Sequence, residues 1–261
     1  MPEKENITTR VNTEIYKCQK CRDIKYVFVD EFVEGYGHRE VAKPCPECNM
    51  AVIASDQRNR AGIPRKYFDT YFSDFMWNLY ESDVSSIKQF TADFVNSYCT
   101  WREKRMGLYI WSNERGSGKT MLASSIMNSL MSAEGVAARF TSVPNYLGIL
   151  QDAFKKKAEE TDHSKQYWDC DVLCLDDLGA EKQSEWANQE LFKLIDYRYT
   201  KGKQIIVTSN IPIKDLECDS RVIDRLNEMC MQIHMPEEGI RALRANDKKQ
   251  KFADSIRQRY Q

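Results

Sequence analysis

Short apolar runs alternate with amphipathic stretches in the part of the chain that follows residue 106. Four of the runs predict strands, at residues 108–111, 137–142, 171–177 and 204–210. A continuous apolar run, rather than an alternating one, is typical of a parallel strand that is buried on both faces. The stretches between the runs have the apolar spacing of helices. This alternation predicts an α/β core with a parallel sheet flanked by helices.

Helical spacing recurs along the chain, and two further segments before the first core strand have patterns of their own. Helices are expected at 84–105, from 119 to about 134, at 143–159, from 186 onward and from 220 onward; residues 67–80 are rich in aromatic side chains, and residues 26–33 with Gly35 and Gly37 suit a hairpin. The aromatic rings of 67–80 can either stack on bases or pack in the core, and packing is the commoner use in a segment that leads into a core.

The loop between the first core strand and its helix carries the clearest chemical signal. It reads Asn113-Glu-Arg-Gly116-Ser117-Gly118-Lys119-Thr120, a P-loop with Asn where the first glycine is usual. We expect the loop amides to hold the β- and γ-phosphates of ATP or ADP at a helix N-terminus. Lys119 would neutralise phosphate charge, and Thr120 would ligate Mg²⁺.

The departure at Asn113 and the glycines that remain affect the loop differently. Asn tolerates positive φ better than other non-glycine residues, so we expect the turn to survive at residue 113. Gly116 and Gly118 stand where the backbone must approach phosphate closely. The predicted nucleotide-binding residues are Asn113, Gly116, Ser117, Gly118, Lys119, Thr120 and Asp176.

Two carboxylates follow the apolar run at 171–175. Asp176 and Asp177 therefore lie at the carboxyl end of a predicted parallel strand, the edge at which open α/β sheets bind their ligands. Asp176 is placed to hold Mg²⁺ through water, and Asp177 to orient or deprotonate the attacking water. The alternative is an ordinary core strand with a solvated acidic end, but the P-loop upstream favours a nucleoside triphosphatase site.

Four of the nine cysteines form two pairs, Cys18-x-x-Cys21 and Cys45-x-x-Cys48. This spacing predicts a tetrahedral structural zinc site between two knuckles, with a hairpin in the 23 residues from 22 to 44. A redox pair would need only one such motif, followed by a helix. The remaining cysteines are expected to be packed thiols: Cys99, Cys170, Cys174, Cys218 and Cys230.

Composition and charge limit the classes of protein that fit. The 261 residues are 42% hydrophobic, enough for one α/β core and a small extra module. The net charge of −1 means that any nucleic-acid binding depends on local patches. No apolar run approaches the length of a membrane span, and the N-terminus lacks the apolar core of a signal peptide, so we expect a cytoplasmic protein without membrane contact.

Several motifs in one order make the sequence resemble a known family. The run Arg60-Ala-Gly-Ile-Pro-Arg-Lys-Tyr67, the P-loop, Asp176-Asp177, Thr208-Ser-Asn210 and Ser220-Arg-Val-Ile-Asp-Arg-Leu226 follow one another along nearly the whole chain. This order resembles the AAA+ helicase loaders of bacteria and their phages, the DnaC/DnaI type, and the related IstB transposition ATPases. The four-cysteine module resembles the zinc-binding N-terminal domain of the DnaI-like branch.

The resemblance implies a fold and three domains. The expected fold is a AAA+ P-loop ATPase core, with a parallel five-stranded sheet flanked by helices and no large lid, joined to a small zinc-ribbon-like domain. The expected boundaries are residues 1–55 for the zinc-binding domain, 56–105 for a linker and lead-in helix, and 106–261 for the ATPase domain. The charged tail from residue 237 is too short for the helical lid of larger AAA+ proteins. Within it, Arg241 is either a phosphate contact or part of a solvated basic helix.

The resemblance also implies roles for residues outside the P-loop. Asn210 falls at the sensor-1 position, where it would bond the γ-phosphate or the attacking water, and Arg221 would project as an arginine finger into the nucleotide of a neighbouring subunit. Arg225 is the reserve candidate. Ser184 and Trp186 could face the pore of a AAA+ ring and contact single-stranded DNA, or Trp186 could cap the core. The catalytic set is thus Asp177, Asn210 and Arg221.

In the resembled family these parts make an ATP-dependent loader, which places the hexameric replicative DnaB-type helicase on single-stranded DNA when replication begins. The expected activity is a weak ATPase that depends on homo-oligomers or DNA, in a bacterial or phage-infected cell. One alternative is an IstB-like transposition ATPase that selects target DNA. Another is a non-hydrolysing adaptor that binds nucleotide and single-stranded DNA, consistent with Asn113 and with Asp177 where many AAA+ proteins have Glu.

Overall fold

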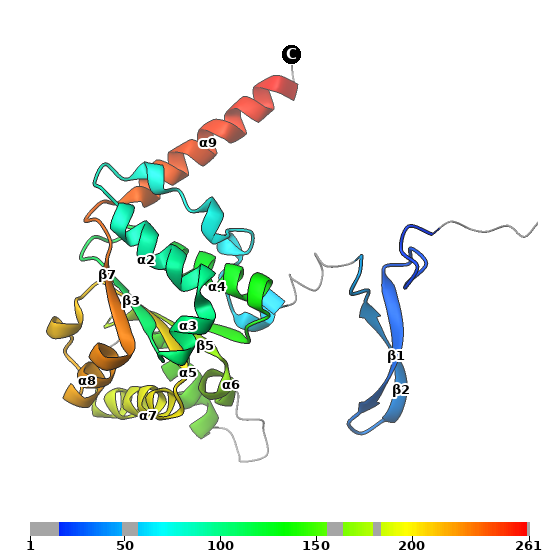
Figure 1. Cartoon of the computed structure of the whole chain (residues 1–261), viewed down its shortest axis with the longest axis horizontal. Helices are drawn as coiled ribbons and strands as arrows, with labels where there is room; N and C mark the ends of the chain where they lie inside the picture. Colours follow the sequence, from blue (N-terminus) through cyan, green and yellow to red (C-terminus); the bar gives the residue numbers. More distant parts are fainter. Residues whose placement is uncertain (1–15, 49–56, 156–163, 180–183, 260–261) are drawn as a thin grey trace, which may run out of the picture. The chain divides into compact units, whose positions relative to one another are not determined.

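The structure is a computed structural model that describes residues 16–48, 57–155, 164–179 and 184–259. The chain divides into two compact units, Met1–Asp56 and Gln57–Gln261 (Figure 1). Each unit is described by itself below. Within the described residues, no helix combines the length and the apolar character needed to cross a bilayer.

The first unit is an antiparallel hairpin of β1 (Tyr26–Val33) and β2 (Gly37–Pro44). Gly35 and Gly37 at its turn have φ of 82° and 71°, a conformation that glycine adopts at no steric cost. The register pairs the first residue of β1 with the last of β2. One cysteine pair precedes β1 and the other follows β2, so this register brings both pairs to the open end of the hairpin.

The second unit contains a five-stranded parallel sheet in the order β4-β5-β6-β3-β7. Its strands are β3 (Gly107–Trp111), β4 (Ala138–Ser142), β5 (Val172–Leu178), β6 (Gln204–Ser209) and β7 (Cys230–His234). The predicted parallel sheet of five strands is therefore confirmed. Four strands follow the apolar runs to within two residues at either end, whereas β7 had no such run to reveal it.

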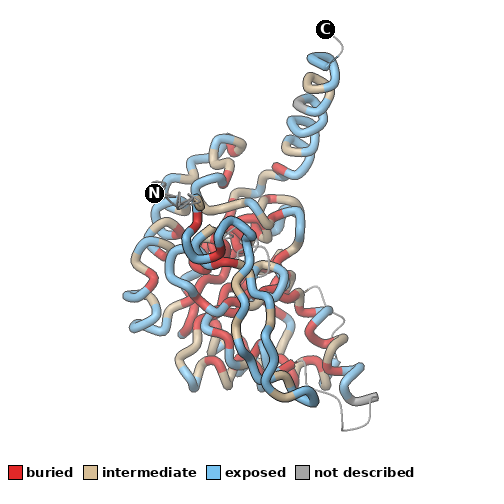
Figure 2. The backbone as a smooth tube through the Cα atoms, turned by 90° about the vertical axis from the view of Figure 1, so that its right-hand side faces the viewer, coloured by how far each residue is buried: buried red, intermediate tan, exposed pale blue. Residues whose placement is uncertain are grey.

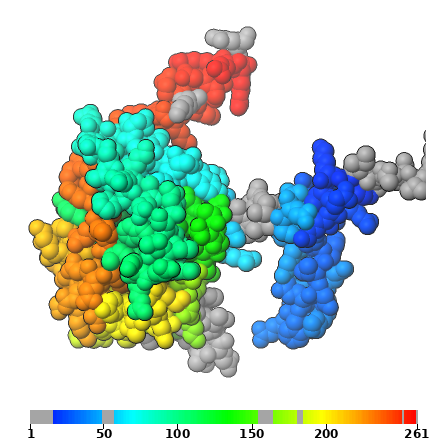
Figure 3. Space-filling view, viewed as in Figure 1, coloured from blue at the N-terminus to red at the C-terminus, as the bar shows by residue number. Residues whose placement is uncertain are grey.

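Helices cover both faces of this sheet. They are α2 (Ser85–Asn96), α3 (Tyr98–Glu103), α4 (Lys119–Glu134), α5 (Val143–Lys155), α6 (Lys165–Asp169), α7 (Glu185–Lys201) and α8 (Ser220–Met229). The last helix, α9 (Ile240–Arg259), is buried only at Ile240 among its described side chains and projects from the unit (Figure 1 and Figure 3). Short 3₁₀ turns lie at Arg65–Tyr67, Phe72–Asp74, Trp77–Leu79 and Ile213–Asp215. The predicted helix 143–159 is described only as far as Lys155, and residues 156–159 lie outside the described residues.

Alternate strand residues feed two separate apolar clusters. Leu108 and Ile110 of β3 join the cluster under α2, α3 and α4, whereas Tyr109 joins the cluster under α5, α6, α7 and α8. Since successive side chains of a strand point to opposite faces, this division gives a three-layer unit with a core on each side of the sheet. Figure 2 shows the buried residues concentrated along these central strands.

The segment before β3 belongs to the same unit as the sheet. Ala61, Ile63 and Tyr67 are buried in the cluster under α4, and the side chain of Asn128 on α4 donates to the carbonyl oxygens of Tyr67 and Thr70, both at 2.8 Å. Residues 57–105, the expected linker and lead-in helix, therefore pack on the core. The aromatic side chains of 67–80 mostly pack rather than face solvent.

The predicted helix 84–105 is instead two helices that meet at Ser97. Ser97 has φ −115° and ψ 30°, outside the helical region, and its hydroxyl bonds the carboxylate of Asp93 at 3.1 Å. The same carboxylate accepts a 2.8 Å hydrogen bond from Trp101 Nε1. These side-chain bonds compete with the helical backbone pattern, which periodicity alone does not reveal.

Candidate nucleotide site

The loop between β3 and α4 is shaped by two glycines in left-handed conformation. Gly116 has φ 87°, and Gly118, the residue before α4, has φ 96°. A Cβ on Gly118 would lie 2.5 Å from the Tyr80 hydroxyl, which donates a 2.6 Å hydrogen bond to the carbonyl oxygen of Ser117. The backbone amides of 116–118 donate to no acceptor within the described residues. This is the arrangement that an anion requires at a helix N-terminus.

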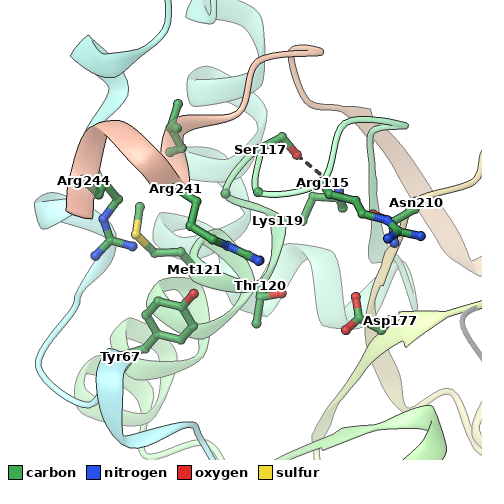
Figure 4. Close-up of a pocket in the computed structure, with 13 residues that line it drawn as sticks. Tyr67, Arg115, Ser117, Lys119, Thr120, Met121, Asp177, Asn210, Arg241 and Arg244 are labelled. Atoms are coloured by element: carbon green, nitrogen blue, oxygen red, sulfur yellow. Dashed lines mark hydrogen bonds between the residues drawn. The ribbon is translucent and has the colours of Figure 1, made fainter. Parts of the chain in front are cut away.

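These amides face a cavity of about 320 Å³. It is lined by Tyr67, Arg115, Gly116, Ser117, Gly118, Lys119, Thr120, Met121, Asp177, Asn210, Ile240, Arg241 and Arg244 (Figure 4). The structure thus brings Asp177 and Asn210, from the ends of two neighbouring strands, to the same cavity as the P-loop. Parallel strands deliver their carboxyl ends to one edge of the sheet, which explains the convergence.

Lys119 is held by the loop it belongs to. Its ammonium donates to the carbonyl oxygens of Ser112 and Glu114, both at 3.0 Å, and to the Ser117 hydroxyl at 3.2 Å. Burial lowers the pKa of Lys119, and carboxylates led by Asp177 and Glu237 partly oppose that shift. The loop therefore fixes a cation at the rim of the amide cradle.

Asp176 is buried, at 6% exposure, and is not among the residues that line the cavity. Thr208 donates a 2.6 Å hydrogen bond from its hydroxyl to Asp176 Oδ1, and the same hydroxyl accepts 3.0 Å from the Asp177 amide. Burial raises the pKa of Asp176, against hydrogen bonds from Thr208 and Thr120 that lower it. Thr120 and Asp176 are the two predicted magnesium ligands. Their role stays a prediction.

Asp177 occupies an unusual backbone position. Its φ is +59°, and the ladder between β5 and β6 shifts register between Leu175 and Leu178. Such a bulge changes the direction in which a side chain points near the end of a strand. Two consecutive carboxylates can therefore lie at the same edge of the sheet. Strain of this kind accumulates at functional sites, which agrees with the predicted role of Asp177.

Asn113 does not have the positive φ that was expected of it. Its amide and its side-chain Nδ2 instead donate to Glu237 Oε1, at 3.1 and 3.3 Å. The amide of Glu114 donates to Glu237 Oε2 at 2.7 Å. The expectation that all the loop amides point inward was therefore wrong for these two, because a carboxylate from beyond β7 binds them.

Several cavity residues were missed by the motifs or placed differently. Arg241 lines the cavity and, in Figure 4, reaches from α9 toward Thr120, which favours a phosphate contact over a purely solvated position. Arg115 and Arg244 also line it, and no ion pair involving any of these three arginines is found in the described part of the chain. Arg115 lies inside the motif at a variable position, so no rule singles it out.

Arg221 is placed away from this cavity. Its side chain is 58% exposed, and its guanidinium pairs with Asp219 at 2.6 Å and lies 3.9 Å from the ring centre of Phe192. That ion pair raises the pKa of Arg221. Arg225, the reserve candidate, pairs with Asp196 at 3.1 Å. Neither side chain lines the cavity of its own chain.

Ser184 and Trp186 lie at the start of α7. The Ser184 hydroxyl accepts a 3.1 Å hydrogen bond from the Ala187 amide and so caps the helix. Trp186 is half-buried and packs against the cluster under α7. These contacts favour the capping interpretation of Trp186, and a DNA contact stays a prediction for both residues.

The four paired cysteines come together in the first unit. Their sulfur atoms all lie within 4.8 Å of one another, with Cys18 and Cys45 at 3.7 Å and Cys21 and Cys48 at 3.3 Å. Zn–S distances of about 2.3 Å place tetrahedral sulfurs about 3.8 Å apart, so the four thiols fit a zinc ion. Among the other cysteines, Cys99 is exposed, contrary to the expectation of a packed thiol.

Curated relatives share the nucleotide-binding part of the chain. Uncharacterized protein YqaM of Bacillus subtilis (strain 168) is 22% identical over 176 residues, 65% of this chain and 55% of that protein. Phage-like element PBSX protein XkdC of the same strain is 27% identical over 146 residues, 54% of each. The chromosomal replication initiator DnaA of Bordetella pertussis (strain Tohama I) is 31% identical over 125 residues, 47% of this chain and 26% of that protein. The chain spans about half the length of the first two and a quarter of the third.

Solved structures share the fold. A crystal structure of the DnaC helicase loader has a TM-score of 0.57 at 24% identity, covering 66% of this chain and 100% of that one. A crystal structure of DnaI has a TM-score of 0.55 at 25% identity, covering 66% of this chain and 94% of that one. A structure of the replication initiator DnaA bound to AMPPCP and single-stranded DNA has a TM-score of 0.55 at 18% identity, covering 66% of this chain and 50% of that one.

The family comparison covers more than half of the chain. It matches residues 87–248, which include the P-loop, both strand-end aspartates, Asn210 and Arg221. Together with the AAA+ fold and the amide cradle at the cavity, this match shows that the chain belongs to the IstB-like ATP binding protein family.

Proposed function

We propose that this chain is an ATPase that loads a hexameric replicative DnaB-type helicase onto single-stranded DNA. The observation that carries the proposal is the cavity in which unpaired loop amides, the Lys119 ammonium, Asp177 and Asn210 face one another. Such an arrangement suits a triphosphate, since amides and a cation neutralise its charge while a carboxylate and an amide address the attacking water. The likeness to DnaC and DnaI loaders supports the helicase as partner.

ATP, its magnesium ion and the residues of one subunit would divide the work as follows. The amides of 116–118 and Lys119 would bind the phosphates, and Thr120 and Asp176 would hold Mg²⁺, which would neutralise part of the phosphate charge. Asp177 orients or deprotonates the water, and Asn210 bonds it or the γ-phosphate. Because burial raises the pKa of Asp176, its carboxylate gains most when a cation is present.

Arg221 would complete the site of a neighbouring subunit. It is exposed, and it does not line the cavity of its own chain, which is what a residue that acts in trans requires. A planar and permanently charged guanidinium stabilises charge that spreads over the transferring phosphoryl group. Hydrolysis would then depend on a homo-oligomer and would be weak in the isolated chain.

Zinc in the first unit would fix a surface for a partner. Cys18, Cys21, Cys45 and Cys48 supply four thiolates, and the ion contributes folding energy rather than chemistry. The single-stranded DNA contact proposed for Ser184 and Trp186 belongs to the second unit. DnaA bound to AMPPCP and single-stranded DNA, which shares the fold, supports a nucleic-acid partner for that unit.

The decisive test combines turnover, subunit mixing and loading. ATP hydrolysis is measured with and without single-stranded DNA and helicase, for the wild type and for Lys119→Ala and Arg221→Ala. Each variant alone should lose at least 90% of the turnover. A tenfold loss corresponds to about 1.4 kcal/mol of lost transition-state stabilisation. A mixture of the two should regain activity, because one intact cradle then meets one intact guanidinium.

The loading assay follows helicase on circular single-stranded DNA. The loader should raise the fraction of circles that carry helicase, with ATP and with Arg221 intact. Wild-type protein that binds ATP without turning it over would instead support the non-hydrolysing adaptor.

A transposition ATPase is a second candidate, because the matching family is the one named for IstB. In that case the protein would select target DNA for a transposase. Purification from the source cell separates the candidates: a hexameric helicase should accompany a loader, and a transposase should accompany the alternative.

A further inference from the structure

The P-loop is bound from outside by one short segment of the chain. This segment, which we name the strap, is residues 234–241, from the end of β7 to the first turn of α9. The Met235 amide donates to the carbonyl oxygen of Trp111 at 2.8 Å, before the loop, and the Arg241 amide donates to the carbonyl oxygen of Gly116 at 3.2 Å, inside it. The strap therefore follows the loop over most of its length.

Glu237, in the middle of the strap, makes the densest contacts. Its two carboxylate oxygens accept from the amides of Asn113 and Glu114, at 3.1 and 2.7 Å, and from the Ser112 hydroxyl at 3.2 Å. The side chain of Asn113 adds a bond at 3.3 Å, and His234 Nε2 lies 2.8 Å away. Burial raises the pKa of Glu237, but the bonds from His234 and from the loop outweigh it and lower the pKa overall.

The peptide group between Ser112 and Asn113 is bound on both sides. Its N–H donates to Glu237, and its carbonyl oxygen accepts from the Lys119 ammonium at 3.0 Å. An anion on the N–H side polarises a peptide group and strengthens the bond that its oxygen accepts. Glu237 also binds the N–H of the next peptide group, between Asn113 and Glu114, and Lys119 also binds the carbonyl oxygen of the one after it, between Glu114 and Arg115. Glu237 and Lys119 thus share the 112–113 peptide group and bind the two groups that follow it.

We propose that Glu237 is a positioning residue for the nucleotide site, fixing the 112–114 backbone that holds the Lys119 ammonium against the phosphates. This inference rests on the proposed function, because it assigns a role in binding the triphosphate. It also explains the departure from the motif: Asn113 gives the carboxylate a donor that glycine lacks. His234 supports Glu237 and stacks on Trp111, with ring centres 3.9 Å apart at an angle of 9°.

The chain offers a matched control in the adjacent residue. Glu238 is also a carboxylate of the strap, but it accepts from the amides of Glu81 and Ser82, at 2.8 and 3.0 Å, and not from the P-loop. Both substitutions remove a carboxylate that accepts two backbone amides. Glu237→Ala and Glu238→Ala therefore differ chiefly in whether the P-loop loses its anchor.

The experiment titrates the full-length protein with Mg-ATP and measures dissociation constant, binding stoichiometry and thermal midpoint. Glu237→Ala should raise the dissociation constant about tenfold, the size expected for loss of charge-assisted hydrogen bonds. Glu237→Gln, which keeps one acceptor oxygen in place, should show a smaller increase. Glu238→Ala should stay within about threefold of the wild type, since it leaves the bonds between the P-loop amides and Glu237 in place.

A merely structural contact would give a different result. It would lower the folded fraction, and hence the stoichiometry, while the protein that remains folded keeps the wild-type dissociation constant. That outcome, or equal dissociation constants for Glu237→Ala and Glu238→Ala, overturns the proposal. If Glu237→Ala fails to fold, Glu237→Gln decides: an unchanged dissociation constant rejects the role.

The proposed function fails in a separate way. Wild-type protein that does not bind Mg-ATP removes both the nucleotide site and the role of Glu237. Wild-type protein that binds Mg-ATP, with Glu237→Ala and Glu237→Gln binding equally well, removes only the positioning role.

Discussion

The two units of the chain achieve a folded state by different means. In the sheet unit, two apolar clusters bury strands and helices on both faces, and the P-loop is shaped by the protein's own hydrogen bonds. In the hairpin unit, the buried cluster consists of Cys18, Cys21 and Cys45 with Val27 and Cys48 against it. The sheet unit can hold its shape before a ligand arrives, whereas the described part of the hairpin unit buries little besides its thiols.

The largest expected effect is therefore metal removal. Chelation of zinc should unfold the hairpin unit, because structural zinc sites contribute about 10–16 kcal/mol of apparent binding energy and a lone hairpin is marginal. The sheet unit should keep its thermal midpoint. Amide exchange resolved by segment, with and without a chelator, measures both units in one sample. If the chelator lowered amide protection in the sheet unit, or left it unchanged in the hairpin unit, this difference between the two units would be contradicted.

The next largest effect should come from Arg198, which is buried at 0% exposure in the sheet unit. Its guanidinium donates to five backbone carbonyl oxygens, those of Tyr167, Trp168, Cys170, Asp171 and Gln204. Arg198→Met should cost about 3 kcal/mol, because the carbonyls lose their donors. Urea unfolding measures this change in the free energy of unfolding. The hairpin unit should be unaffected, and Lys201→Met on the same helix is the exposed control.

A smaller effect of opposite sign should follow from Asp176→Asn. Burial raises the folded-state pKa of Asp176, so its ionised form costs stability that the protein recovers as pH falls through that pKa. The amide should raise the free energy of unfolding by about 1 kcal/mol at pH 7, and the gain should vanish below the ordinary carboxyl pKa. Magnesium-dependent turnover should be lost. A destabilised variant at pH 7 would contradict this account of the buried carboxylate.

The smallest effect should be at Ser184, which caps α7. Ser184→Ala should lower the free energy of unfolding by about 1 kcal/mol or less. Ser184→Asp should keep most of the wild-type free energy of unfolding, since aspartate also caps helices. Chemical denaturation compares the three proteins. If instead both variants lose affinity for single-stranded DNA at unchanged stability, the hydroxyl serves DNA rather than the helix.

Sequence reasoning located the elements of this fold whose hydrophobic pattern is set by burial. A continuous apolar run such as that of β5 is typical of a central strand, and the apolar residues Met121, Leu122, Ile126, Met127 and Leu130 predicted α4 although the structure buries it on nearly all sides. β7 was not predicted because it is an edge strand in which only Cys230 and Ile233 are buried, so it has no continuous apolar run. The break at Ser97 escaped because it depends on side-chain bonds to Asp93.

For the site, the local motifs were readable and the long-range contacts were not. The P-loop, Asp177 and Asn210 converge because parallel strands end at one edge, which a sequence can express. Glu237 and Arg241 reach the loop from far along the chain, and nothing in the spacing signals that. The pattern of charges in the C-terminal segment has no periodicity that predicts a contact with a distant loop.

The left-handed backbone at Asp177 restricts which side chains can replace it. Asparagine and aspartate accept that conformation with little steric penalty, whereas longer or branched side chains pay more for it. A designer who lengthens this carboxylate to the glutamate that many AAA+ proteins carry would therefore also have to reshape the bend that holds it. The side chain and the bend depend on each other, so a change in one alone would move the carboxylate away from the cavity.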